Sequence, residues 1–503
     1  MKTLLSASAL AVAFASPGFA QPALTIYNQN FATVRDQVAL DLKEGINEAR
    51  FADTTAHVEP DSVVLRDPAG KVALHILEQN YRADPVSEGL LLSLNEGKEI
   101  DFFVPGVGGR PDRVVKGKII RSGYTPHSNL AMQRYGNEYY YNQQAMAQGM
   151  QPIIEVDGRL QFDLPGRPRF PSLADDTILK PTLVWKLHAT AAAKFQAEIG
   201  YVTGGMSWEA AYNVVSPEKG DTLDLTGWVT MDNESGKTFG EAKVQLVAGD
   251  VMKLDSNNSR AAGRAARSMV FADAAAAPEV TEKSFDEYHL YSLPLATTLH
   301  DRETKQVEFV RASGIKAGRI YVYDGVKIDP TRWGNNSMQQ IRNLEDYGTE
   351  SNPKVSVMRE IRNSEANHLG IALPRGKVRF YRSDDAGQLQ FTGENIIDHT
   401  PKDETLRIYT GNAFDLVGER KRTNYKMDHS NHWIDETFEI KLRNHKREAV
   451  EIRVVEHLYR WTNWEIRNAS STFLKTDAQT MEFLIPLKPD EEQTVSYTVH
   501  YSW

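Results

Sequence analysis

The sequence predicts a mainly β protein, built of several antiparallel β-sandwich domains of immunoglobulin-like architecture with one short inserted loop or helical segment. Apolar and polar side chains alternate through much of the chain, which is the pattern of strands that bury one face. Helical periodicity is not found over any comparable length. The chain has 503 residues, enough at roughly 150 residues per domain for about three domains with their own cores.

The clearest strand lies between residues 494 and 503, where apolar side chains occupy every second position. They are Val495, Tyr497, Val499, Tyr501 and Trp503. A hairpin is predicted around Asp157-Gly158, a dipeptide suited to the positive φ angles of a two-residue turn.

Two further pairs of alternating segments are predicted to form hairpins. The first joins 223–231 to 242–246 across the turn 233–236, and the second joins 438–442 to 450–454 across 444–447.

Domain boundaries are predicted near residues 175 and 375. They give an N-terminal β domain over 21–175, a central β-sandwich over 176–375 and a C-terminal β-sandwich over 376–503. Residues 122–152 are rich in Tyr, Gln, Asn and Met, which indicates a surface insertion, either tolerated or used for recognition. Residues 255–278 are Ser/Asn-rich and then Ala-rich, as in a flexible linker.

Residues 1–20 are typical of a secretory signal peptide. Lys2 is followed by an apolar stretch over 4–15 and by Gly18-Phe19-Ala20, with small residues where signal peptidase cleaves. Position 21 is glutamine, so the cysteine of a lipoprotein anchor is missing. No later stretch reaches the ~18 apolar residues of a spanning helix. We therefore expect an exported protein, periplasmic or extracellular, without a transmembrane helix.

Composition excludes several classes of function. The chain contains no cysteine, which removes disulfide scaffolds, cysteine-ligated zinc or iron–sulfur sites and thiol nucleophiles. Its formal charge of −9 argues against nucleic acid as a partner. The signatures of serine hydrolases, zinc helices, phosphate-binding loops and calcium loops are absent, so no cofactor is expected.

One segment contains the residue types of a metal site. His429, His432 and Asp435 lie within 428–435, a stretch with two imidazoles and two carboxylates that could supply nitrogen and oxygen ligands. A solvated turn ahead of the next strand is the alternative interpretation.

The aromatic residues near the end of the sequence are the candidate binding residues. Aromatic faces stack on sugar rings or on partner side chains, and their polar edges form hydrogen bonds. Simple core packing is the alternative, and we assign it to Trp503. Trp461 and Trp464 are three apart, so on a strand they point to opposite faces and one of them is expected outside the core. The candidates are Trp433, Tyr459, Trp461 and Trp464.

Several short motifs occur in an order that resembles a known family. The first group is His57-Val58-Glu59-Pro60-Asp61-Ser62-Val63, Ser207-Trp208-Glu209 with Tyr212, and Asp232-Asn233-Glu234-Ser235-Gly236. The second is Asn363-Ser364-Glu365, Leu373-Pro374-Arg375-Gly376-Lys377-Val378-Arg379, and Gly411 with Phe414-Asp415. Together they resemble the mucoidy-inhibitor-like family, a family of domains of unknown function. The resemblance implies a β-rich exported envelope protein with a link to exopolysaccharide. It supplies no catalytic residues, and the coiled coil of many members is missing here.

These observations favour an exported, non-enzymatic protein that binds or scaffolds an envelope partner or a surface polysaccharide. An envelope hydrolase or metal-assisted enzyme is the first alternative, because scattered His, Asp and Glu residues can converge without a motif. An outer-membrane β-barrel is the second, indicated by the alternating last strand that ends in an aromatic residue. Charged residues on strand after strand could face a lumen, but the long Ala-rich and Tyr/Gln-rich stretches fit a barrel poorly.

Overall fold

The computed structural model describes residues 21–503 with several gaps. The gaps are 83–84, 107–110, 125–150, 174–176, 218–219, 250, 252, 254–280, 286–287 and 335. The predicted signal peptide, most of the 122–152 insertion and the whole 255–278 linker lie outside the described residues. The domain boundaries predicted near 175 and 375 stay a prediction.

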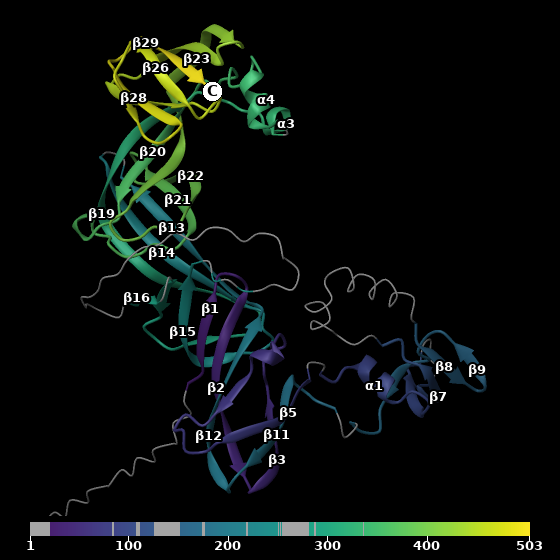
Figure 1. Cartoon of the computed structure of the whole chain (residues 1–503). Helices are drawn as coiled ribbons and strands as arrows, with labels where there is room; N and C mark the ends of the chain where they lie inside the picture. Colours follow the sequence, from purple (N-terminus) through teal and green to yellow (C-terminus); the bar gives the residue numbers. More distant parts are fainter. Residues whose placement is uncertain are drawn as a thin grey trace, which may run out of the picture. The chain divides into compact units, whose positions relative to one another are not determined.

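The structure is mainly β, as predicted, with 61% strand and 5% helix. The chain divides into two compact units (Figure 1). The first contains residues up to 209 together with 230–306, and the second contains 210–229 and 307–503. No helix among the described residues is long and apolar enough to span a membrane.

The first unit contains a large mixed sheet in which β1 pairs in parallel with β15 and antiparallel with β2. Its strand order is β16 (Thr281–Phe285), β17 (Tyr288–Ser292), β15 (Phe239–Ala248), β1 (Ala23–Tyr27), β2 (Phe31–Leu42), β12 (Ala193–Gly204) and β4 (Val64–Arg66), with β18 (Thr297–Leu299) also paired to β15. Leu24 and Ile26, alternate residues of β1, are fully buried, whereas the residues between them are only partly buried.

Two smaller sheets complete this unit. One is formed by β3 (Gly45–Ala52), β11 (Thr182–Ala189) and β5 (Leu74–Arg82), with the turn η1 (Pro60–Ser62) nearby in sequence. The other has the order β10 (Arg167–Arg169), β6 (Glu99–Val104), β7 (Arg113–Arg121), β8 (Ile153–Val156) and β9 (Arg159–Gln161). Leu92 of α1 (Glu88–Leu94) joins the apolar core of this second sheet. The hairpin predicted at Asp157-Gly158 is confirmed, since β8 pairs with β9 and both turn residues have positive φ.

The second unit is built on a 13-stranded sheet. Its main order is β22 (Leu389–Ile397), β21 (Gly376–Ser383), β13 (Met206–Ser216), β14 (Thr222–Asn233), β19 (Glu303–Asp324), β20 (Lys354–Arg362), β23 (Thr405–Asp428), β24 (Trp433–Asn444), β29 (Glu492–Ser502) and β26 (Trp464–Ala469). A branch from β19 adds β25 (Val450–His457), β28 (Thr480–Leu487) and β27 (Phe473–Lys475). The turn η2 (Glu365–Asn367) follows β20.

The main apolar core of the second unit draws side chains from both parts of this sheet. Phe438 and Ile440 come from β24, Val495 comes from β29, and Ile452 and Phe483 come from the branch strands β25 and β28. The predicted last strand is confirmed as β29, in which alternate residues are buried as the sequence pattern indicates.

The two other predicted hairpins are wrong, because the strands at each turn pair with different neighbours. β24 pairs with β23 and β29, whereas β25 pairs with β19 and β28. In the same way β14 lies between β13 and β19, whereas β15 lies beside β1, β17 and β18. Alternation fixes which face of a strand is buried but carries no information on the hydrogen-bonded neighbour.

A buried asparagine explains why the chain changes neighbour at these turns. Asn233 and Asn444 stand at the ends of β14 and β24, and each amide donates to three backbone carbonyls, two of them far along the chain. Asn363, after β20, donates to the carbonyls of Ile371, Thr400 and Pro401 in the same manner. The side-chain amide thus replaces the ladder hydrogen bonds that the turn lacks.

Candidate functional site

The segment between β19 and β20 carries two short helices on the second unit. In α3 (Pro330–Trp333), the side chain of Asp329 accepts from the Thr331 N–H, and Pro330 fits the first turn. In α4 (Met338–Asn343), Ser337 and Gln340 form a capping box. These caps define where each helix begins, and they place Arg342 in the last turn of α4.

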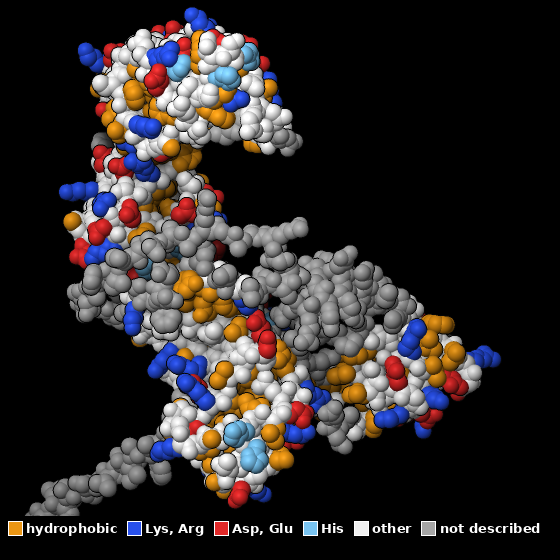
Figure 2. Space-filling model, viewed as in Figure 1, with side chains coloured by type: hydrophobic (Ala, Val, Ile, Leu, Met, Phe, Trp, Pro, Cys, Tyr) orange, Lys and Arg blue, Asp and Glu red, His pale blue; other side chains and the backbone are white. Residues whose placement is uncertain are grey.

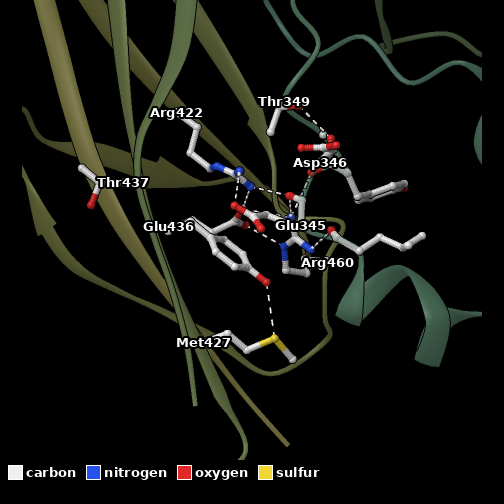
Figure 3. A network of polar contacts seen from close by, with 12 residues as sticks. Glu345, Asp346, Thr349, Arg422, Met427, Glu436, Thr437 and Arg460 are labelled. Carbon is white, nitrogen blue, oxygen red and sulfur yellow. Dashed lines mark hydrogen bonds and ion pairs between the residues drawn. The ribbon is translucent and has the colours of Figure 1, made fainter. Parts of the chain in front are cut away.

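A buried arginine holds the end of α4 to the sheet. Arg460, which follows β25, is 2% exposed, and its guanidinium makes two hydrogen bonds of 2.8 and 2.9 Å to the Glu436 carboxylate on β24. Figure 3 shows Arg422 of β23 reaching the same carboxylate, at 3.1 Å. The Arg460 guanidinium also donates to a row of backbone carbonyls, those of Ile341, Arg342, Leu344, Glu345 and Tyr347.

A second buried ion pair lies beside the first. The Nε of Arg420 is 2.9 Å from the nearer oxygen of Glu456, which is fully buried, and the Arg420 guanidinium also donates to the Gly348 carbonyl. Tyr497 donates its hydroxyl to Glu456 at 2.5 Å. Burial raises the pKa of Tyr497 well above its usual range, so the hydroxyl keeps the proton that it donates.

The cavity between these two ion pairs is too small to hold a substrate. Its volume is about 20 Å³, and Arg420, Glu436, His457 and Arg460 all lie along its walls. A volume of this size accommodates about one water molecule. The buried charges are therefore arranged to position the α3–α4 segment, since each charge is matched by an opposite one and by backbone dipoles.

The segment so positioned presents Arg342 to two tryptophans. The guanidinium carbon of Arg342 lies 4.6 Å from the ring centre of Trp461 and 4.3 Å from that of Trp503. Trp461 directly follows Arg460, and the Arg460 guanidinium donates to the Arg342 carbonyl. The buried ion pair of Arg460 therefore positions both Trp461 and Arg342. The described residues place no carboxylate against Arg342, and its buried Nε has no hydrogen-bond partner. We call Arg342, Trp461 and Trp503 the Trp–Arg cluster.

Two other candidate aromatic residues also carry a basic side chain on the ring. Lys475 lies 4.4 Å from the ring centre of Trp464, whose indole N–H donates to the Ala478 carbonyl. Tyr459 stacks on His457, with ring centres 4.9 Å apart. Figure 2 shows Lys, Arg and His side chains next to hydrophobic ones on the visible face of this unit.

His457 is held by Asp324 as well as by Tyr459. Its Nε2 is 2.9 Å from the Asp324 carboxylate, and Nδ1 is 3.5 Å from the Thr480 hydroxyl. The hydrogen bond to Asp324 raises the pKa of His457 despite partial burial of the ring.

The structure separates Trp433 from the other aromatic candidates. Trp433 is paired across the strands with Ser502, and Trp464 is paired with Tyr501. Neighbouring residues of a strand point to opposite faces, so Trp433 and Trp464 lie on opposite faces of the sheet. Trp433 contacts His500 instead, with ring centres 5.8 Å apart.

Trp461 and Trp464 both pack against the main core of the second unit, as does Trp503, and all three remain partly buried. The expectation that Trp461 and Trp464 point to opposite faces depends on a strand that contains both. β26 begins only at Trp464, so that spacing rule does not apply.

The predicted metal ligands do not converge. Among the described residues, no group of three or more His, Asp or Glu side chains is arranged to hold a metal ion. His429 and His432 lie in the turn between β23 and β24. The Asp435 carboxylate already contacts His500 at 2.6 Å and Arg467 at 3.6 Å. His432 instead lies edge-on to Trp503, with ring centres 6.0 Å apart.

Sequence reasoning missed the residues that build this site, although a signal for the buried ones was present. Glu436 stands at an inward position of the alternation Ile434, Glu436, Phe438, and Glu456 stands at the inward position after Val454. A charge at an inward position of an otherwise apolar alternation indicates a buried ion pair. Arg342 has no comparable signal, because it lies on a helix far from the tryptophans in sequence.

No family model matches the sequence, and no curated protein matches it. The function is therefore inferred from the residues and geometry of the second unit.

Proposed function

We propose that the protein is an exported binding or scaffolding protein of the cell envelope, without enzymatic activity, and that it binds a surface polysaccharide or an envelope partner. The observation that carries this proposal is the Trp–Arg cluster. It holds together two indole rings and a guanidinium that no carboxylate of the described residues pairs with. Indole rings stack on the apolar faces of sugars, and a fixed guanidinium donates several hydrogen bonds in one plane.

Pre-organisation supports a binding role for this cluster. A flexible arginine loses conformational freedom when it captures a ligand, at a cost of about 0.5–1.5 kcal/mol per ordered side chain. Here two rings and the Arg460 network restrict Arg342 and its backbone in advance. Rigid aromatic and arginine side chains are also the types enriched at binding hot spots.

The finer fold and family assignments belong to the same proposal. We assign a β-sandwich architecture of immunoglobulin-like type, supported by turns at which consecutive strands change neighbour and by one core shared between the two branches of the sheet. We also place the chain in the mucoidy-inhibitor-like family. The support for that placement is the order of its motifs, and two of them are the buried asparagine turns at Asn233 and Asn363.

A hydrolase or metal-assisted enzyme is the second candidate, and the His457–Asp324 pair is the observation that favours it. An imidazole oriented by a carboxylate is the arrangement of a general base. The adjoining cavity of about 20 Å³ has no room for a substrate, and the Thr480 hydroxyl lies 3.5 Å from the Nδ1 of His457. Binding is therefore the better supported function.

Binding assays with matched tryptophan variants test the proposal. Trp461→Ala removes one ring of the Trp–Arg cluster, whereas Trp433→Ala removes an indole from the opposite face of the sheet. The ligands are cell-surface polysaccharide and detergent-solubilised envelope proteins, measured by titration calorimetry and by crosslinking. We expect Trp461→Ala to weaken binding roughly tenfold or more and Trp433→Ala to leave it unchanged. Unchanged circular dichroism would show that both variants fold, and equal binding by Trp461→Ala and the original protein would refute the proposal.

A further inference from the structure

Arg342 differs from the arginines around it in having no counterion within the described ranges of the chain. Arg420, Arg422 and Arg460 each contact a glutamate, and Arg332 on the neighbouring helix contacts Glu350 at 2.9 Å. The described residues supply no such partner for Arg342, and none for Lys475 on the ring of Trp464. Two basic groups are thus held on tryptophan rings with their charges unneutralised.

The unsatisfied donors of Arg342 indicate the charge of a ligand. Its Nε is buried and has no hydrogen-bond partner. A buried donor without a partner costs about 1–3 kcal/mol, more when it is charged. Cation–π contacts with indole rings stabilise the charge of a guanidinium but do not accept its in-plane hydrogen bonds. The Nε is closed off from solvent, so an anion would approach the two Nη groups, which donate to no described residue.

The neighbouring rings indicate the rest of the ligand. A planar carboxylate matches the guanidinium fork with two parallel hydrogen bonds, and a pyranose ring presents an apolar face to an indole. Uronic acid sugars carry both groups on one ring. We infer that the Trp–Arg cluster binds an acidic polysaccharide that contains uronic acid residues, an inference that rests on the proposed function. Arg342 would bind the carboxylate, and a tryptophan would stack on the sugar face.

The charge of the whole protein makes this recognition local. With 58 basic and 67 acidic residues, the chain as a whole repels a polyanion at long range. Attraction therefore depends on short-range contacts at the Trp–Arg cluster.

Chemically matched ligands separate charge from sugar recognition. Polygalacturonate carries a carboxylate on every ring, and its fully methyl-esterified form keeps the rings and removes the charges. Dextran sulfate tests whether a polysaccharide with other negative charges binds equally well. Poly(glutamate) tests whether an acidic polypeptide does. Each ligand is titrated into the full chain by calorimetry at low ionic strength.

Three variants assign the interaction to Arg342. Arg342→Gln removes both the charge and the planar donor fork of the guanidinium, whereas Arg342→Lys keeps the charge alone. Arg332→Gln is the control. Arg332 also lies on a tryptophan, 4.4 Å from the Trp333 ring centre, but it is paired with Glu350. We expect polygalacturonate to bind roughly tenfold or more tightly than its methyl ester, and Arg342→Gln to abolish that difference. Arg342→Lys should keep part of the affinity difference between polygalacturonate and its ester, and Arg332→Gln should keep all of it.

The outcomes distinguish this inference from the proposed function. Equal binding of polygalacturonate and its ester, or an unchanged difference in Arg342→Gln, would overturn the inference and leave sugar binding in place. Equally tight binding of dextran sulfate or poly(glutamate) would overturn the uronic acid assignment. If surface polysaccharide and envelope proteins both fail to bind, the proposed function itself is wrong.

Discussion

Two neighbouring regions of the second unit hold arginine in opposite ways. In the interior, Arg460 is fully buried and its guanidinium is matched by Glu436 and by backbone carbonyls. At the Trp–Arg cluster, Arg342 is partly exposed, lies on two indole rings and has no carboxylate partner in the part of the chain that the structure describes. The two residues are linked, because Arg460 donates to the Arg342 carbonyl.

The difference shows how burial determines the partner of a charge. A fully buried cation requires a counterion, since removing an ion from water costs several kcal/mol even after relaxation. A partly exposed cation keeps some of its hydration, so the weaker attraction of an aromatic face is sufficient to hold it. The interior charges are consequently used for positioning, and the charge at the cluster remains available for a ligand.

Removing the anion from the interior should have the largest effect on stability. Glu436→Gln keeps the shape of the side chain but leaves Arg460 and Arg422 without their shared carboxylate. Breaking a buried ion pair from one side costs about 3–5 kcal/mol. Denaturant unfolding measures this loss of unfolding free energy. It is read from the unfolding transition whose midpoint the substitution shifts. A loss near zero would mean that the interior pair is solvated, and the contrast with Arg342 would disappear.

Loss of a neutral buried group should cost less. The Asn444 amide donates to the carbonyls of Glu448, Leu487 and Lys488, and its oxygen accepts from the Lys446 N–H at 2.9 Å. Asn444→Ala leaves these groups unpaired in the interior, which should lower the free energy of unfolding by about 2–3 kcal/mol. Asn431, exposed in the turn before β24, is the control, and Asn431→Ala should unfold as the original does. Equal stability of the two variants would show that the asparagine turn is not a structural element.

The sequence was sufficient to predict the strands but not their pairing. The alternation of Val495, Tyr497 and Val499 depends only on local burial, and β29 has the predicted buried face. The pairing of β24 and β25 with separate neighbours depends on Asn444 contacting residues about 40 positions away. Such a contact cannot be recognised in one sequence, whereas the Asp157-Gly158 hairpin is set by its own turn residues.

The candidate site was predictable only in part, for the same reason. Trp461 and Trp464 could be singled out because aromatic residues cluster in sequence near them. Arg342 is brought to Trp461 by contacts of Arg460 with a helix more than 110 residues earlier in the chain. The expected metal ligand Asp435 pairs instead with His500, its partner across strands β24 and β29.

A pH-dependent contribution is expected from the partly exposed pair His457–Asp324. The Asp324 carboxylate raises the pKa of His457, so the folded state favours the protonated imidazole. The stabilisation is complete below the unfolded pKa of about 6.5 and is lost as the pH rises through the higher folded value. Its size should be less than about 1 kcal/mol, because Asp324 is half exposed.

Asp324→Asn should remove this pH dependence. Melting temperatures measured on both sides of pH ~6.5 should fall more steeply with rising pH in the original protein than in the variant, and the two curves should meet at alkaline pH. Parallel curves would show that the imidazole is not stabilised by Asp324 in solution.

The smallest effect is expected from an exposed pair with the same chemistry as the interior one. Arg311 and Glu308 lie on β19 with 64% and 34% of their side chains exposed, and their charged groups are 2.5 Å apart. Water already solvates both ions, so the loss of their attraction in Glu308→Gln is largely compensated by hydration of Arg311. We expect its unfolding curve to superimpose on that of the original protein, in contrast to Glu436→Gln. The two substitutions make the same chemical change, an arginine-paired glutamate to glutamine. A similar loss in both would therefore show that burial does not set the difference between the interior arginines and those held near the surface.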